Sequence, residues 1–280
     1  TAYTLEITGC KGGHSGVEID KGRANPNVLM GRLLQEMQKE TSLQIVSVDG
    51  GLKDNAIPVQ SKAVVVCANE AGAEVLAQAV SSMQSIFSNE YKTADPDIKI
   101  TLTKEENAKV KVTDRMTTDK IICMLTCMPN GIQSMSMDIE GLVQTSLNIG
   151  IVETHEDYFR MSFCVRSSVD SEREMINRRI GALMAQFGGT MAIEGDYKGW
   201  EYKKDSTLRE LMIEVFKDQY GKEPKVEAIH AGLECGMFAG KIPGLDCVSI
   251  GPDLNQIHTV RESMNIPSVQ RVYAFVLEVL

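Results

Sequence analysis

The sequence predicts an α+β fold of two similar units, followed by an incomplete α/β segment with parallel strands. Segments with a two-residue repeat, typical of half-buried strands, are interspersed with segments of helical spacing. Their order is strand, helix, strand, strand, helix, strand, which is the ferredoxin-like arrangement, and it is nearly repeated once. After "GDYKGWEY" (195–202) the order becomes helix, strand, short helix, strand, helix, which is typical of parallel strands with crossover helices.

The first unit begins with a strand at residues 3–8, where apolar and polar side chains alternate. A helix is expected from Pro26, because Asn25 can cap it and proline suits a first helical turn. Two strands, a second helix and a last strand then complete the unit. They are expected at 45–48, 59–67, 75–87 and 97–103, and the turn-rich "DGGLKDNAIP" (49–58) separates the first two.

The second unit and the tail follow by the same reasoning. The unit is expected to have helices at 117–128 and 171–187 and strands at 142–152, 158–166 and 191–194. In the tail, strands are expected at "KVEAIH" (225–230) and "DCVSIG" (246–251), with helices at 208–216, 234–240 and 269–280. A parallel sheet needs cover on both faces, and a segment with so few strands is too small to form a stable domain alone. The tail is therefore interpreted as part of a larger α/β domain.

Composition excludes several classes of function. The net charge is −9 with both signs interspersed, so no basic stripe for nucleic acid is expected. No apolar run reaches the roughly 18 residues of a membrane span. The odd number of cysteines, seven, indicates reduced thiols in a cytoplasmic protein, and Cys123 and Cys127 are expected to be buried thiols rather than zinc ligands. The opening "TAYTLEITG" is how a piece of a longer protein would begin.

Two histidine motifs each allow two interpretations. In "KGGHSG", His14 is either incidental to a glycine turn or an imidazole held on a thin loop that donates to developing negative charge. "HAGLECG" (230–236) follows an expected strand and opens a helix, a position that favours a ligand site. It contains His230 and Glu234, and Glu234 can equally serve only to offset the helix dipole. A nucleophilic pair of Cys235 with His230 lacks a third orienting group.

Two further candidates stay open on the residues alone. In "GPDLNQIHTVRES" (251–263), His258 is either a metal ligand supported by Glu262 or part of a surface loop. Arg166 ends a strand on its polar face, where it can grip a carboxylate or be a solvated edge charge.

Five motifs taken together resemble the aminoacyl-histidine dipeptidases, or cytosolic non-specific dipeptidases, of the two-zinc peptidase clan. They are, in order, "GCKGGHSG", "GGLKDNAIP", "GLVQTSLNIGIVE", "HAGLECGMF" and "IHTVRES". The resemblance implies a lid domain at 1–196 that mediates homodimerisation, and the C-terminal part of a zinc peptidase catalytic domain at 197–280. It also implies a dipeptide substrate, of Xaa-His or broad specificity, and two zinc ions in the full-length enzyme.

The same resemblance implies roles for individual residues. His14 matches the lid histidine that stabilises the oxyanion, and His258 matches the last zinc ligand, with Glu262 behind it. The substrate-binding positions that the resemblance implies are Asn55, Arg166, His230 and Glu234, with Arg166 on the terminal carboxylate.

The sequence departs from the family in one respect. The other zinc ligands and the glutamate general base are expected in a stretch before Thr1, and nothing in the sequence replaces them. We therefore expect the parent protein to hydrolyse dipeptides and this chain alone to be inactive. Two alternatives stay open: a non-catalytic dimerisation or binding module, and a related metallo-deacylase or tripeptidase.

Overall fold

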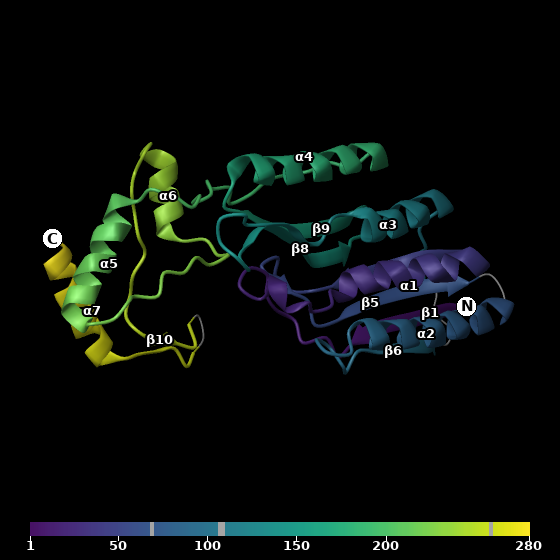
Figure 1. Ribbon diagram of the computed structural model, residues 1–280. Coiled ribbons are helices and arrows are strands. Elements are labelled where there is room, and N and C mark those ends of the chain that lie inside the picture. Colours follow the sequence, from purple (N-terminus) through teal and green to yellow (C-terminus); the bar gives the residue numbers. More distant parts are fainter. Residues whose placement is uncertain (68–69, 106–109, 258–259) are drawn as a thin grey trace. The chain divides into compact units, whose positions relative to one another are not determined.

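The computed structural model describes residues 1–67, 70–105, 110–257 and 260–280 (Figure 1). Within it the chain divides into two compact units. The first comprises residues 1–167 and 171–192, and the second comprises 168–170 and 193–280.

The first half of the first unit has the predicted chain order of strands and helices. Four strands pair antiparallel in the spatial order β6-β1-β5-β3. They are β1 (Ala2–Thr8), β3 (Leu43–Gly50), β5 (Ser61–Cys67) and β6 (Lys99–Glu105). Two short strands, β2 (Gly13–His14) and β4 (Ala56–Ile57), pair with each other outside this sheet, and a 3-10 turn, η1 (Ile19–Lys21), follows β2.

The second half adds strands to the same sheet instead of forming a separate unit. The long strand β8 (Val143–Thr154) pairs with β9 (Phe159–Ser167) along one edge. Its other edge pairs with β7 (Gly131–Met135) and, through Gly50 opposite Val152, with β3. The mixed α/β fold is thus one seven-stranded sheet, and the prediction of two separate units is wrong.

The predicted strand at 191–194 is also absent, whereas β7 was not predicted. Residues 191–194 form no ladder, and Met191 and Ile193 are 38% and 55% exposed. The register shifts of β7 around Ser134 interrupt its alternation, which removes the sequence signal for a strand.

Four helices cover one face of the sheet (Figure 1). They are α1 (Pro26–Glu40), α2 (Glu70–Glu90), α3 (Arg115–Cys127) and α4 (Asp170–Phe187). The core lies between the two layers, where Leu5 and Ile7 of β1 pack in one cluster with side chains of all four helices. The predicted start of α1 is confirmed: Asn25 Oδ1 accepts from Asn27 N at 3.0 Å, and Pro26 is the first helical residue.

The expectation that Cys123 and Cys127 are buried is wrong. Both are exposed, with their Sγ atoms 3.8 Å apart. Residues four apart share one helix face, and α3 buries its other face through Ile121 and Leu125.

The second unit is mainly helical. Its helices are α5 (Thr207–Tyr220), α6 (Glu234–Lys241) and α7 (Ile266–Val279), and its two short strands, β10 (Leu254–Asn255) and β11 (Ser263–Met264), pair antiparallel. Helices α5 and α7 meet through Phe216 and Phe275, whose rings lie edge to face at 5.7 Å.

The predicted parallel strands at 225–230 and 246–251 are not strands in this unit. A parallel strand needs hydrogen-bonding neighbours on its flanks, and the described residues of the unit supply none to these segments. Both segments therefore stay without a ladder, and the prediction of a parallel sheet within this chain is wrong.

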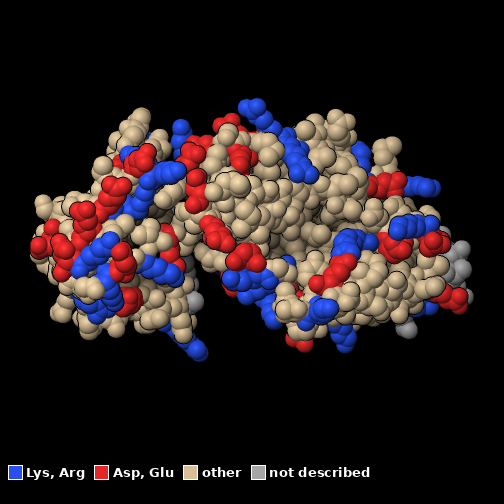
Figure 2. Space-filling model, viewed as in Figure 1, with Lys and Arg blue, Asp and Glu red and all other residues tan. Residues whose placement is uncertain are grey.

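Charged side chains are mixed over the visible surface. On the face shown in Figure 2, Lys and Arg alternate with Asp and Glu, as the sequence composition suggests. Among the described residues, no helix combines the length and apolarity needed to cross a membrane.

Candidate functional site

The short β2–β4 pair brings His14 and Asn55 together. Gly13 lies opposite Ile57 and His14 opposite Ala56. Next to this pair, Ser15 N donates to the main-chain oxygen of Asn55 at 3.0 Å. Two of the motifs that the sequence analysis singled out therefore form one local structure in the first unit.

Glycine is required at two positions before His14. Gly12 has φ +63° and Gly13 has φ +142°, conformations that L side chains rarely adopt. A Cβ atom on Gly12 would lie 2.7 Å from the carbonyl oxygen of Ile57. The glycines thus let the backbone cross close to β4 and turn just before His14.

The imidazole of His14 is held in one tautomer. Its Nδ1 accepts hydrogen bonds from the main-chain N–H groups of Gly16, at 3.1 Å, and Val17, at 3.2 Å. An Nδ1 atom that accepts carries no proton, so the neutral ring bears its proton on Nε2. His14 is half-buried, and the loop assigns its Nε2–H the role of donor.

The loop that carries Asn55 rests on strand β8. Asn148 Nδ2 donates to the carbonyl oxygens of Ala56, at 2.8 Å, and Asp54, at 3.3 Å. At Gly150, a Cβ atom would lie 2.6 Å from the carbonyl carbon of Asp54, so the loop and strand touch through backbone. Asn55 itself is exposed at the tip of the loop.

Arg166 lies on the same face of the sheet as Asn148. It pairs with Ser146 on β8, and the next pair on that face is Cys164 with Asn148. Its Nε atom is buried and has no hydrogen-bond partner among the described residues. A buried guanidinium donor without an acceptor is uncommon, and it suits the binding of an anionic group.

The remaining candidates lie in the second unit. His230 is half-buried just before α6, and Glu234 is exposed as the first residue of that helix, whose N-cap, Leu233, supplies no side-chain hydrogen bond. Glu262 is exposed before β11. His258 lies outside the described residues. The structure therefore groups His14, Asn55 and Arg166 in one unit and places His230, Glu234 and Glu262 in the other.

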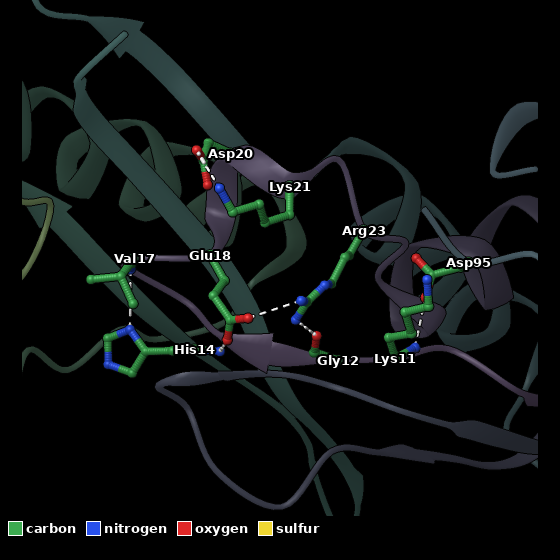
Figure 3. Close-up of polar contacts among 9 residues, drawn as sticks. All are labelled: Lys11, Gly12, His14, Val17, Glu18, Asp20, Lys21, Arg23 and Asp95. Carbon is green, nitrogen blue, oxygen red and sulfur yellow. Dashed lines mark hydrogen bonds and ion pairs between the residues drawn. The ribbon is translucent and has the colours of Figure 1, made fainter. Parts of the chain in front are cut away.

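Three residues around the His14 loop were missed by sequence reasoning (Figure 3). Glu18 and Arg23 form an ion pair at 2.8 Å, and Asp95 is fully buried beneath the loop. Neither Arg23 nor Asp95 belongs to a recognisable motif. Only the spacing of Glu18, four residues after His14, could have suggested a link.

The described residues do not fit a two-zinc site. Within them, no three His, Cys, Asp or Glu side chains come together as a metal-binding group. A catalytic zinc ion needs at least three protein ligands.

Comparison with known proteins shows that the chain is similar to peptidases. Residues 5–95 match the peptidase dimerisation domain family. The chain is 32% identical over 278 residues to the cytosol non-specific dipeptidase of Escherichia coli (strain K12), covering 99% of this chain and 57% of that protein. The aminoacylhistidine dipeptidase of Vibrio alginolyticus has a crystal structure that superposes with a TM-score of 0.92 at 31% identity. That match covers 99% of this chain and 56% of the other.

The chain thus spans a little over half the length of the relatives that it matches. These matches confirm the resemblance that the motifs predict: residues 5–95 are similar to the peptidase dimerisation domain family, and almost the whole chain is similar to part of a cytosol non-specific dipeptidase and of an aminoacylhistidine dipeptidase.

Proposed function

We propose that this chain is part of a dipeptidase and that His14 donates its Nε2–H to the oxyanion of the tetrahedral intermediate. The observation that carries the proposal is the pair of main-chain N–H donors on Nδ1, because they leave Nε2 to carry the proton and an oxyanion needs a donor that is already oriented. The short β2–β4 pair presents this donor beside Asn55.

Substrate binding is proposed for four further residues. Arg166 binds the terminal carboxylate, which supplies the acceptor that its buried Nε lacks among the described residues. Asn55 holds the substrate from the exposed loop. His230 and Glu234 line the specificity pocket. A dipeptide of Xaa-His or broad type suits His14 and Arg166 of the first unit, since it offers one peptide carbonyl and one carboxylate.

The metal chemistry belongs to the longer protein. By resemblance, two zinc ions, when bound, would supply Lewis-acid chemistry and a metal-activated water molecule, and this chain would contribute His258 as a ligand, with Glu262 behind it. The remaining ligands and the general base are proposed to come from further polypeptide. We accordingly propose residues 1–196 as lid and 197–280 as the C-terminal part of the catalytic domain, with the 280 residues inactive alone.

Exposed apolar side chains in the second unit support this division. Phe238 on α6 is 57% exposed, Ile266 on α7 is 70% exposed and Tyr273 is 66% exposed. Exposed apolar side chains of this kind, where they gather on one face, are usually covered by a partner surface. Homodimerisation through the first unit and a cytoplasmic location are proposed from the relatives.

Hydrolysis of β-alanyl-histidine, with and without a chelator, tests the proposal. It compares this chain with a longer form that spans the length of the relatives. Chelator-sensitive hydrolysis is expected only in the longer form. There, His14→Ala should lower kcat by roughly 100- to 1000-fold at unchanged zinc content, as loss of one oxyanion donor does.

His155→Ala is the matched control, because His155 lies on the β8–β9 turn and contacts only Glu153 and Tyr158 in the interactions that the structure gives. Full turnover of His14→Ala would refute the oxyanion role. Inactivity of the longer form with zinc bound would point to another substrate, such as a tripeptide or an acylated amine.

A second candidate function is a dimerisation or binding module without chemistry. The match of residues 5–95 to a dimerisation domain favours it, as does the lack of a three-donor group among the described residues. A longer form that binds no zinc, cleaves no peptide and sediments as a dimer would establish this alternative.

A further inference from the structure

We propose that Glu18 and Arg23 are positioning residues for His14: together they fix the backbone of the Gly12–His14 segment so that the imidazole keeps its proton on Nε2. The effect on catalysis rests on the proposed function. The effect on the tautomer does not, and it can be measured in this chain.

Glu18 contacts His14 at both of its backbone polar groups. Glu18 Oε2 accepts from His14 N at 2.8 Å, and Glu18 N donates to His14 O at 3.2 Å. These two bonds close a turn from His14 to Glu18. Gly16 and Val17, whose N–H groups donate to Nδ1, belong to this turn. The turn that Glu18 closes therefore presents the two donors that select the tautomer.

Arg23 holds the other side of the same segment. Its Nη2 pairs with Glu18 Oε1 at 2.8 Å, and its Nη1 donates to the carbonyl oxygen of Gly12. The pair lies against Gly13, where an added Cβ would come within 2.7 Å of Glu18 Oε2. The two side chains thus bind the residues on either side of Gly13, which as a glycine has no side chain of its own to restrict its backbone.

Glu18 hydrogen-bonds to the backbone of His14 and not to its ring. Figure 3 shows the imidazole extending away from the Glu18–Arg23 pair, with its Nδ1 edge toward Val17. A carboxylate on Nδ1 would hold a proton there and make the ring a base, whereas two N–H donors occupy the Nδ1 lone pair. A second proton could enter only by displacing both donors, so the arrangement suits a hydrogen-bond donor.

The charge state and anchorage of the network fit this role. The hydrogen bond from His14 N and the charge of Arg23 keep the pKa of the Glu18 carboxyl below its usual range, so Glu18 is ionised at neutral pH. Beneath the loop, Asp95 accepts from Lys11 N at 2.6 Å and from Ala24 N at 2.8 Å. Both ends of the segment between Lys11 and Ala24 are thereby fixed on one buried side chain.

Imidazole nitrogen NMR tests the proposal directly. The chain has only four histidines, so a long-range proton–nitrogen spectrum of the 15N-histidine-labelled chain is simple, and His14→Ala assigns the His14 signals. We expect an unprotonated Nδ1 and a protonated Nε2 in the native chain. In Glu18→Ala and Arg23→Ala, the two nitrogen shifts should move toward the average of exchanging tautomers.

Glu18→Gln is the conservative variant, because its amide oxygen can still accept from His14 N, and it should restore much of the native pattern. Arg32→Ala is the matched control: Arg32 on α1 forms a two-point ion pair with Glu90 on α2, at 2.6 and 2.9 Å. The backbone amide spectrum verifies that each variant is folded. An unchanged His14 tautomer in folded Glu18→Ala and Arg23→Ala would overturn the proposal.

Activity of the longer form separates this inference from the proposed function. Glu18→Ala should lower kcat on the order of 100-fold with little change in KM, as misplacing a group that acts in the transition state does. If the tautomer is lost but His14→Ala keeps full activity, the positioning stands and the oxyanion role fails. If His14→Ala is inactive and the tautomer survives Glu18→Ala, the positioning proposal fails.

Discussion

Asn148 donates its side-chain amide to the main-chain oxygen of Ala56 at 2.8 Å, and Ala56 is the residue that pairs with His14. This hydrogen bond therefore fixes the position of the small β2–β4 pair relative to strand β8 of the main sheet. The oxygen of the same side-chain amide, Asn148 Oδ1, accepts a hydrogen bond from Nδ2 of Asn25, the cap of α1, at 3.1 Å. One buried side chain thus connects the helix layer, the sheet and the His14 loop.

Asn148→Ala should destabilise the fold and loosen this loop. It removes a 1% exposed amide and leaves the Ala56 oxygen and the Asn25 amide each without one partner, at a cost of about 1–3 kcal/mol. Urea unfolding of the chain measures the loss. Gln133→Ala is the control, because Gln133 bonds only to neighbouring carbonyls in β7 and should change stability little.

Gly150→Ala should displace the Asn55 loop. The new methyl group would lie 2.5 Å from Asp54 Cα and 2.6 Å from its carbonyl carbon, and backbone cannot move aside as a flexible side chain can. We expect a lower melting temperature and shifted amide signals at 54–56. Gly181→Ala in α4 meets only a methionine sulfur at 3.7 Å, so it should be neutral or stabilising. Equal behaviour of the two variants would contradict the close contact.

Arg166→Lys in the longer form should raise KM for dipeptides by about 10- to 100-fold, because lysine cannot make the two-point contact with a carboxylate. A C-terminally amidated dipeptide should be cleaved poorly by both proteins and show little difference between them. Arg160→Lys is the control on the same strand, since Arg160 already pairs with Glu153 at 2.5 Å. An unchanged KM for Arg166→Lys would remove this residue from the substrate site.

Glu172 should contribute stability that depends on pH. Hydrogen bonds from Ser134, at 2.5 Å, from Thr145 and from Gln144, at 2.8 Å, hold the pKa of its carboxyl below the usual range. A carboxyl with a lower pKa when folded stabilises the protein above its unfolded pKa, and this stabilisation disappears as pH falls through the folded pKa.

Comparing the unfolding free energy of Glu172→Gln with that of the native chain checks the sign. The native chain should be the more stable at pH 7, and the difference should shrink below about pH 4. A difference that grows in acid would show that the carboxyl is not stabilised as an anion.

Cysteine labelling should separate exposed from buried thiols. Burial, with the nearby charge of Asp95, raises the pKa of the Cys10 thiol to about 12, so almost no thiolate exists at pH 8. Cys123 and Cys127 are exposed. Iodoacetamide followed by peptide mass analysis should find these two modified first, and Cys10 only after unfolding. Early labelling of Cys10 would mean that the loop above Asp95 opens readily.

Local patterns predicted most elements of the first unit. The cap at Asn25, the alternation in β1 and the helical spacing of α1 and α4 are local signals, and each element lies where expected to within a few residues. The predictions that were wrong concern features that depend on pairing between strands far apart in the sequence. Whether β7–β9 form a separate unit is decided by the pairing of Gly50 with Val152, which no local pattern records.

The site divides in the same way. The glycines around His14 and the turn before Asn55 could be recognised in the sequence, but their contact is formed by long-range pairing. Glu18 and Arg23 were missed because an ion pair that binds backbone groups leaves no motif, and Asp95 because its partners, Lys11 and Ala24, lie far from it in the sequence. The prediction of a parallel sheet in the tail was wrong because a strand needs hydrogen-bonding neighbours on its flanks, and a local sequence pattern does not show whether they are present.

The junction of β3 and β8 is a seam in the sheet. The ladder between these strands consists of the pair Gly50–Val152. Beyond this pair, the Thr154 hydroxyl accepts from Val48 N at 2.8 Å and donates to Val48 O at 3.0 Å, and Thr154 N donates to the Asp49 carboxylate at 2.9 Å. Asn27 Nδ2 also bridges the seam, because it donates to the carbonyl oxygens of Gly50, at 3.3 Å, and Ile149, at 3.4 Å. Under a pulling force, this seam is where the sheet should part first.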